Sequence, residues 1–259
     1  MTSLLEARGI TKHFGGIKAL NDITFRVKPG QIKAIIGPNG AGKTTLFNCI
    51  SGVLKADKGE IRLNGESIVK LPPHRRAAAG ISRTFQNVAI FPEMTVLENV
   101  LVGRHCRSKC EMLKAGFRTM SMRREEKDIE DKGWSFLEFV GLEEQADKLA
   151  SELPLGDQRM LEIARALATE PKIVLLDEPA GGLNTKETER LAELIHQIRN
   201  SGVTVLLVEH DMNLVMDISD EILVINFGKK LAEGDPKSVK ENPDVINAYL
   251  GEDIDFSDL

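Results

Sequence analysis

The 259-residue sequence predicts an α/β fold: a mixed, mainly parallel sheet covered by helices, an antiparallel β subdomain and an inserted α-helical subdomain. After residue 158, apolar strand runs alternate with amphipathic helical patterns, which is typical of a parallel sheet wrapped by helices. Near the start, apolar and polar residues alternate, which indicates antiparallel strands. Between 88 and 157 the strand signals disappear. We therefore expect one domain with a core at 1–87 and 158–251, a helical subdomain at 88–157 and an acidic tail at 252–259.

The first expected strands are of two kinds. Residues 23–27 alternate apolar with polar side chains before a Pro29-Gly30 turn, as in an antiparallel strand with one buried face. Ile32–Ile36 is almost continuously apolar, as in a strand that is covered on both faces. Residues 61–63 form a short strand that ends at Asn64-Gly65, a hairpin signal.

Helical patterns dominate the middle of the chain, and helices alternate with strands after it. Apolar spacing up to Leu142 predicts an amphipathic helix in the inserted subdomain. One face of a later helix gathers leucine and isoleucine at 191, 194, 195 and 198, so that face is expected to be buried. The order expected beyond the insertion is a helix at 158–169, a strand at 173–176, a helix at 186–200, strands at 203–208 and 222–225, and a helix ending at 247–250.

The composition excludes several classes of protein. Lys plus Arg number 34 and Asp plus Glu 39, and the net charge of −5 argues against a general electrostatic grip on nucleic acid. The longest apolar runs fall far short of the roughly 18 residues that a membrane-spanning helix needs. The N-terminus lacks the layout of a signal peptide, and sparse cysteines are typical of a reduced, cytosolic chain.

The segment after residue 103 carries weaker signals. Cys106 and Cys110 lie beside His105, but no second ligand pair follows in the sequence, so a zinc site is not expected there. Arg and Lys are concentrated at 104–124, as on a solvated helix face, and a contact with another protein or with a lipid surface is the alternative.

The strongest local signal is a glycine-rich segment that follows an expected strand and opens an expected helix. It matches G-x-x-x-x-G-K-[ST], the pattern of phosphate-binding loops. Its glycines bring backbone N–H groups close to phosphate oxygens, and the following helix adds its dipole. Lys43 can reach the β- and γ-phosphates of a nucleotide, and the Thr44 hydroxyl can ligate Mg²⁺. The expected nucleotide-binding residues are Gly37, Pro38, Asn39, Gly40, Ala41, Gly42, Lys43, Thr44 and Thr45.

Polar residues at the ends of two later strands add the groups that hydrolysis requires. Asp177 follows an apolar strand and is expected to hold Mg²⁺, as a strand-end carboxylate does in P-loop nucleotide hydrolases. Glu178 is the next residue and is expected to act as general base toward the attacking water. His210 lies just beyond another strand, and the carboxyl ends of parallel strands face one ligand crevice. It is therefore expected to reach a γ-phosphate.

In this order and spacing, the motifs resemble the ATP-binding cassette (ABC) family over nearly the whole chain. Asp177-Glu178-Pro179 is similar to the family's Walker B motif with its catalytic glutamate. The resemblance implies that Phe14 stacks on adenine. It implies that Gln86 contacts the metal and the attacking water, and that His210 is the switch histidine. ATP and Mg²⁺ are the cofactors that it implies, on a P-loop nucleotide-hydrolase core.

The signature motif departs from the family pattern. Where the family has Leu-Ser-Gly-Gly-Gln, this chain reads Leu153-Pro154-Leu155-Gly156-Asp157. In the family, this segment of one subunit caps the γ-phosphate held by the other. A proline offers neither a hydroxyl nor an N–H, so the serine contact cannot be carried over. Gly156, Asp157 and the helix start remain, and we expect them to cap ATP in a weakened or rearranged form.

Segments at 83–86, 156–165 and 242–251 resemble, more narrowly, the ATPases of high-affinity branched-chain amino-acid importers. The resemblance implies an ATPase that drives transport through separate permease chains, peripheral on the inner face of the cell membrane. A second ABC ATPase subunit, identical or different, and indirectly a substrate-binding protein are the further partners that it implies. The alternatives are the ATPase of a lipopolysaccharide-type exporter and a non-transport ABC switch on ribosomes or DNA.

Overall fold

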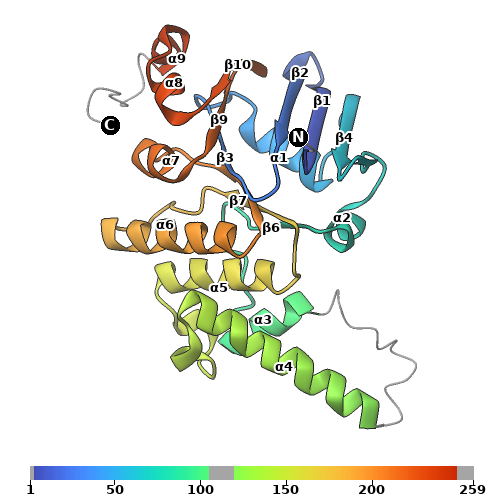
Figure 1. The fold of residues 1–259 in the computed structure, drawn as a ribbon, viewed down its shortest axis with the longest axis vertical. Coiled ribbons are helices and arrows are strands. Elements are labelled where there is room, and N and C mark those ends of the chain that lie inside the picture. The colour runs from blue at the N-terminus through green and yellow to red at the C-terminus, as the bar shows by residue number, and fades with distance from the viewer. Residues whose placement is uncertain (1–2, 105–119, 250–259) are drawn as a thin grey trace. The chain divides into compact units, whose positions relative to one another are not determined.

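The computed structural model describes residues 3–104 and 120–249, which divide into two units (Figure 1). One unit runs up to Arg83 and resumes at Lys172, and the other spans Thr84–Pro171. The cysteines at 106 and 110, most of the basic segment at 104–124 and the acidic tail lie outside the described residues.

The first unit contains a six-stranded sheet with the order β10-β9-β3-β8-β7-β6. All neighbouring strands are parallel except β10, which pairs antiparallel with β9. Every residue of β3, β7 and β8 is buried, which explains their apolar runs. The predicted mixed, mainly parallel sheet is confirmed. The strands are β3 (Ile32–Ile36), β6 (Ile81–Arg83), β7 (Ile173–Asp177), β8 (Thr204–Val208), β9 (Glu221–Asn226) and β10 (Lys229–Gly234).

A second, antiparallel sheet belongs to the same unit and has the order β2-β1-β4-β5. Residues 23–27 alternate between buried and exposed positions, as predicted. The β4–β5 hairpin turns at Asn64 and Gly65, whose φ angles of 51° and 82° are the positive values of a type I′ turn. One apolar cluster joins this sheet to α1 and to the six-stranded sheet. The strands are β1 (Leu5–Phe14), β2 (Ile17–Val27), β4 (Lys58–Leu63) and β5 (Glu66–Ser67).

Most helices of the first unit connect its strands, and the last two follow β10. α6 begins at a capping box, in which the side chains of Asn184 and Glu187 each accept the other residue's backbone N–H. Its buried residues are the predicted leucines and isoleucines at 191, 194, 195 and 198. The helices are α1 (Lys43–Ser51), α2 (Pro73–Ala79), α6 (Thr185–Asn200), α7 (Met212–Ile218), α8 (Pro236–Lys240) and α9 (Pro243–Tyr249).

The second unit is built from α3 (Val96–Arg104), α4 (Met120–Val140), α5 (Leu155–Leu167) and the 3₁₀ turns η3 (Glu143–Gln145) and η4 (Ala150–Glu152). α5 packs against α3 and α4. The approach is close, since a Cβ atom on Gly103 would lie 2.3 Å from the carbonyl oxygen of Arg165. Because α5 packs on the inserted helices, this unit spans Thr84–Pro171, whereas the sequence led us to expect a helical subdomain at 88–157.

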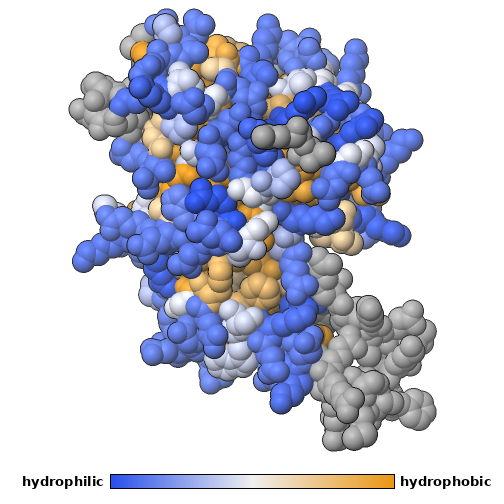
Figure 2. All heavy atoms as spheres, viewed as in Figure 1, coloured by the Kyte–Doolittle hydropathy of each residue, from blue (hydrophilic) through white to orange (hydrophobic). Residues whose placement is uncertain are grey.

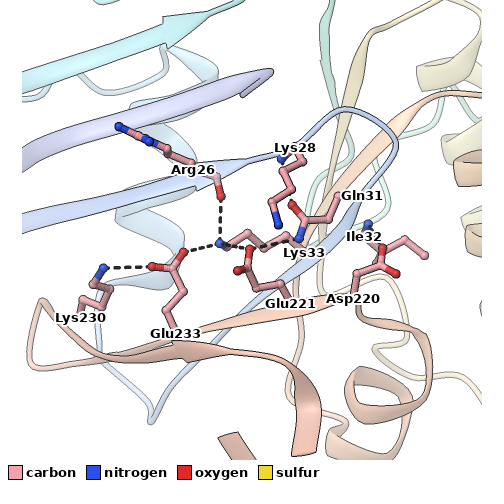
Figure 3. A network of polar contacts seen from close by, with 9 residues as sticks. All are labelled: Arg26, Lys28, Gln31, Ile32, Lys33, Asp220, Glu221, Lys230 and Glu233. Carbon is pink, nitrogen blue, oxygen red and sulfur yellow. Dashed lines mark hydrogen bonds and ion pairs between the residues drawn. The ribbon is translucent and has the colours of Figure 1, made fainter. Parts of the chain in front are cut away.

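A buried ammonium group ties the central strand to the edge of the sheet (Figure 3). Lys33 on β3 is fully buried, and its Nζ donates to the carbonyl oxygen of Arg26 at 2.9 Å and to Glu221 Oε2 at 2.8 Å. It also bonds to Glu233 on β10. Burial opposes ionisation of Glu221, but the hydrogen bond and charge of Lys33, together with the bond from Gln31 and the charge of Lys28, lower its pKa. The network therefore joins β2, β9 and β10 to β3.

The molecular surface is mostly polar on the face that Figure 2 displays. Over residues 3–104 and 120–249, no helix is both long enough and apolar enough to cross a membrane.

Candidate functional site

The phosphate-binding loop connects β3 to α1, and two of its glycines are required by their surroundings. Gly37 has a φ of 155°, and a Cβ atom there would lie 2.0 Å from the carbonyl oxygen of Ile225. Gly42 has a φ of 109°, and a Cβ atom there would lie 2.6 Å from the carbonyl oxygen of Ala19. No other residue type fits either position without displacing backbone. The predicted strand–loop–helix context is therefore present.

Lys43 begins α1 and turns back over the loop. Its side chain is buried, and its Nζ donates to the carbonyl oxygens of Gly37 at 2.5 Å and Pro38 at 3.1 Å. Thr44 is exposed in the same helical turn. The ammonium group thus lies inside the curve of a glycine-rich loop at a helix N-terminus, where backbone geometry and charge both favour an anion.

Asp177 ends β7, and an arginine holds its carboxylate. The side chain is 2% exposed, and its Oδ2 accepts from Arg83 Nη2 at 2.6 Å. Arg83 Nη1 also donates to Asn48 Oδ1 at 2.6 Å and to Ser51 Oγ at 3.0 Å on α1. Sequence reasoning assigned Arg83 no role of its own, and it predicted no strand at 81–83 that would have placed this cation beside β7. The guanidinium links the carboxylate to the helix that follows the phosphate loop.

Glu178 and His210 come together at the ends of the neighbouring strands β7 and β8. Glu178 Oε1 lies 2.9 Å from His210 Nε2, and the two side chains are 20% and 40% exposed. The backbone N–H of Glu178 donates to the carbonyl oxygen of Val208 at 2.9 Å. Glu178 has a φ of 49°, a strained value for a residue with a side chain. A carboxylate and an imidazole in contact, both open to solvent, can together bind and polarise a water molecule.

A third acidic residue, Glu209, directly precedes His210, and sequence reasoning assigned it no role. It is 3% exposed, and its Oε1 accepts from the backbone N–H of Ala180 at 2.7 Å. Burial raises the pKa of Glu209, against the opposing effect of its backbone hydrogen bonds.

Phe14 ends β1 and is 47% exposed, with Lys12 Nζ 5.6 Å from the centre of its ring. Asp57 holds the preceding residues: it accepts from the backbone N–H of His13 at 2.7 Å and from Lys12 Nζ at 3.0 Å. The backbone bond from His13, followed by the bond from Lys12, lowers the pKa of Asp57 to about 2. The strand end is therefore fixed while an aromatic face stays open for stacking.

The remaining predicted site residues, Gln86, Gly156 and Asp157, belong to the second unit. The carbonyl oxygen of Gln86 accepts from Arg159 Nη2 on α5 at 2.9 Å, and the side chain of Gln86 is exposed. Gly156 is buried in the first turn of α5, whose N-cap is Pro154. Asp157 Oδ2 accepts from Gln145 Nε2 at 3.0 Å. The signature segment is thus the start of a helix, as predicted, and the helix begins at Leu155 rather than at 158.

Two family models match this chain. Residues 20–181 match the model described as ABC transporter. The chain belongs to the ABC transporter family. Residues 229–255 of the cassette match a second model, described as branched-chain amino acid ATP-binding cassette transporter. ABC transporter ATP-binding proteins are ATPases, so the cassette is a nucleotide-binding ATPase.

Several curated proteins and solved structures are similar to the cassette over almost its full length. The high-affinity branched-chain amino acid transport ATP-binding protein BraF of Pseudomonas aeruginosa is 50% identical over 96% of this chain and 98% of its own. LivG of Escherichia coli, which carries the same description, is 49% identical over the same shares. A crystal structure of an ABC transporter cassette in its ADP conformation has a TM-score of 0.85 at 36% identity and covers 97% of this chain and 100% of that one. A dimeric bacterial ABC cassette has a TM-score of 0.76 at 26% identity, and the match covers 90% of this chain and 98% of that one.

The donor set of the ABC cassette fits a magnesium ion that is bound together with a nucleotide. The Thr44 hydroxyl and the Asp177 carboxylate are hard oxygen donors, which Mg²⁺ prefers. In the described segments, no group of three or more His, Cys, Asp or Glu side chains could hold a metal ion by itself. Phosphate oxygens and water would therefore complete the coordination, which is the usual arrangement for Mg²⁺.

Proposed function

We propose that this chain is the ATP-hydrolysing subunit of an importer of branched-chain amino acids. It binds permease subunits, which are separate chains, at the inner face of the cell membrane. A substrate-binding protein delivers the amino acid to the permease. The names of BraF and LivG and the match at residues 229–255 support this substrate class.

In the proposed site, the phosphate loop at 37–45 and Lys43 bind the ATP phosphates, and Phe14 stacks on adenine. Asp177, Thr44 and Gln86 would hold Mg²⁺, which would neutralise charge on the phosphates. Glu178 takes the proton of the attacking water, and His210 contacts the γ-phosphate. The observation that carries this assignment is the contact of 2.9 Å between Glu178 and His210 at adjoining strand ends.

A second cassette completes the proposed site. Gly156 and Asp157 of one subunit bind the γ-phosphate held by the other, through the first turn of α5. Pro154 lies at the N-cap and contributes neither a hydroxyl nor an N–H to this contact. The likeness to a dimeric ABC cassette supports the pairing.

The test is ATP hydrolysis by the full chain, alone and reconstituted with its permease and binding protein. Glu178→Gln should retain ATP binding and lose turnover, because the base is absent while the phosphate contacts remain. Lys43→Ala should weaken ATP binding itself. Leucine should stimulate hydrolysis in the reconstituted system, whereas an equal concentration of a charged amino acid should not. Undiminished turnover by Glu178→Gln would remove Glu178 from its role, and indifference to leucine would contradict the substrate class.

A further inference from the structure

Glu209 is a buried carboxylate between the two loops that carry the proposed base and the switch histidine. It follows β8 directly and is 3% exposed. Its Oε1 accepts from the backbone N–H of Ala180 at 2.7 Å. Its Oε2 accepts from the backbone N–H groups of His210 at 2.8 Å and Asp211 at 3.3 Å. One side chain therefore binds backbone on both loops.

Glu209 joins the loop that carries Glu178 to the loop that carries His210, so it influences how these two side chains lie relative to each other. Ala180 lies two residues after Glu178, and His210 is the residue that contacts Glu178. The N–H bond from Glu178 to Val208 already joins the loops at one point. Glu209 adds a second point on the other side of Glu178. The strained φ of 49° at Glu178 is thus held from both sides.

A carboxylate suits this position better than any neutral side chain. Burial works against its charge, and in the described part of the chain no basic side chain forms an ion pair with Glu209. Its charge is supported by backbone N–H donors, which prefer an ionised acceptor. Both oxygens of a carboxylate accept, whereas glutamine would turn an NH₂ group toward one of the loops. Burying a charge costs free energy, and a role in fixing two loops at once explains why a charged side chain occupies this position.

We propose that Glu209 is a positioning residue for ATP hydrolysis, which locks the Glu178 loop to the His210 loop so that the base and the switch histidine keep their contact. This inference rests on the roles proposed above for Glu178 and His210. Glu209 touches neither the nucleotide nor the water and acts through the backbone of its neighbours.

The decisive comparison is Glu209→Gln against wild type in steady-state ATP hydrolysis by the full chain. Because the nucleotide contacts are unchanged, KM for ATP should stay within about threefold, while kcat should fall about 10- to 100-fold, the range expected for a small misplacement of reacting groups. Asp220→Asn is the matched control. Asp220 also accepts a hydrogen bond from a backbone N–H, that of Ile32 at 2.7 Å, but at the opposite end of the sheet. The kcat of Asp220→Asn should therefore stay within about twofold of the wild-type value. A kcat of Glu209→Gln within about twofold of wild type would overturn the proposal.

A double-mutant cycle separates positioning from a general loss of stability. In a His210→Ala background, Glu209→Gln should lower kcat by a smaller factor than in wild type, because part of its effect passes through His210. Equal factors in both backgrounds would count against the lock. Glu178→Gln is assayed beside them: if it still hydrolyses ATP, the proposed base is wrong, whereas an inactive Glu178→Gln with a fully active Glu209→Gln rejects only the role of Glu209.

If Glu209→Gln does not fold, amide hydrogen exchange of the wild-type protein tests the proposal instead. The N–H groups of Ala180 and His210 should exchange slowly, because both are bonded to the buried carboxylate. Exchange of both groups at the rate of exposed loop amides would contradict the lock.

Discussion

Glu178 and Phe227 both adopt a positive φ, 49° and 45°, although neither side chain favours the left-handed region. At Glu178 the strain coincides with the proposed base and is held by hydrogen bonds on both flanks. At Phe227 the cause is different. Phe227 and Gly228 form the two-residue turn between β9 and β10, with φ angles of 45° and 72°, which a type I′ hairpin requires. Phenylalanine fits this turn poorly, and Phe227 as a whole is 84% exposed.

Replacing Phe227 by asparagine should stabilise the protein, because asparagine tolerates the left-handed region. We expect a gain of about 0.5–1 kcal/mol, or about 1–3 °C in the midpoint of thermal unfolding. Phe227→Ala is the control, since it removes the ring and keeps the backbone penalty. An equal rise in the unfolding midpoint of both variants would show that relief of backbone strain is not the source of the added stability.

At the scale of elements, the end of β1 is held by the segment before β4. The backbone N–H of Asp57 donates to the carbonyl oxygen of Thr11 at 2.9 Å, while its carboxylate accepts from Lys12 and His13. β1 pairs with β2 through several register shifts, the last of them between Lys12 and His13. An irregular strand end of this kind needs support outside the sheet ladder, and Asp57 supplies it immediately before Phe14.

The low pKa of Asp57 makes this support dependent on pH. The pKa of the Asp57 carboxyl group is about 2 in the folded protein and 3.8 in the unfolded chain, where its hydrogen bonds are absent. Between these two pH values the unfolded chain therefore binds more protons. The contribution of ionised Asp57 is therefore complete above pH 3.8 and is lost as the pH falls through about 2. Urea unfolding of wild type and Asp57→Asn should differ most at pH 5–7, and the difference should shrink as the pH falls from about 4. A difference that is constant with pH would contradict this role.

The sequence predicted those elements whose signal is local. The buried strands β3, β7 and β8 are apolar runs, and the phosphate loop is a contiguous motif. β1 was missed because its bulges interrupt the alternation of apolar and polar residues. The sequence predicted the helix at the signature segment to begin at 158, but it begins at Leu155. Pro154 is its N-cap, so the helix begins directly after the proline. Arg83 was missed because its partner Asp177 is 94 residues away, a pairing that only the fold creates.

At the scale of the whole molecule, the proposed ATP site needs two copies of the chain. Lys43, Asp177, Glu178 and His210 belong to the first unit, whereas Gly156 and the rest of the signature segment belong to the second. In the proposed dimer, the signature segment of one cassette binds the ATP held by the other. Assembly of the pair should therefore depend on ATP.

Sedimentation of the Glu178→Gln chain tests this dependence, since the variant should bind ATP without consuming it. We expect a dimer with ATP and Mg²⁺ and a monomer without nucleotide. The double variant Lys43→Ala, Glu178→Gln is the control and should stay monomeric at the same ATP concentration. A monomer of Glu178→Gln at saturating ATP would refute the proposed pairing.

The buried Lys33 also has a consequence for synthesis of the chain. Its carboxylate partners lie 188 and 200 residues further along, and β3 is flanked in the sheet by β8 and β9, which are equally late. At usual elongation rates, a ribosome needs about 10–40 s to reach them. Until then the strand has a cation without its partners and two unpaired edges. The pairing of β3 within the six-stranded sheet can therefore be completed only after residues 204–233 have emerged from the ribosome.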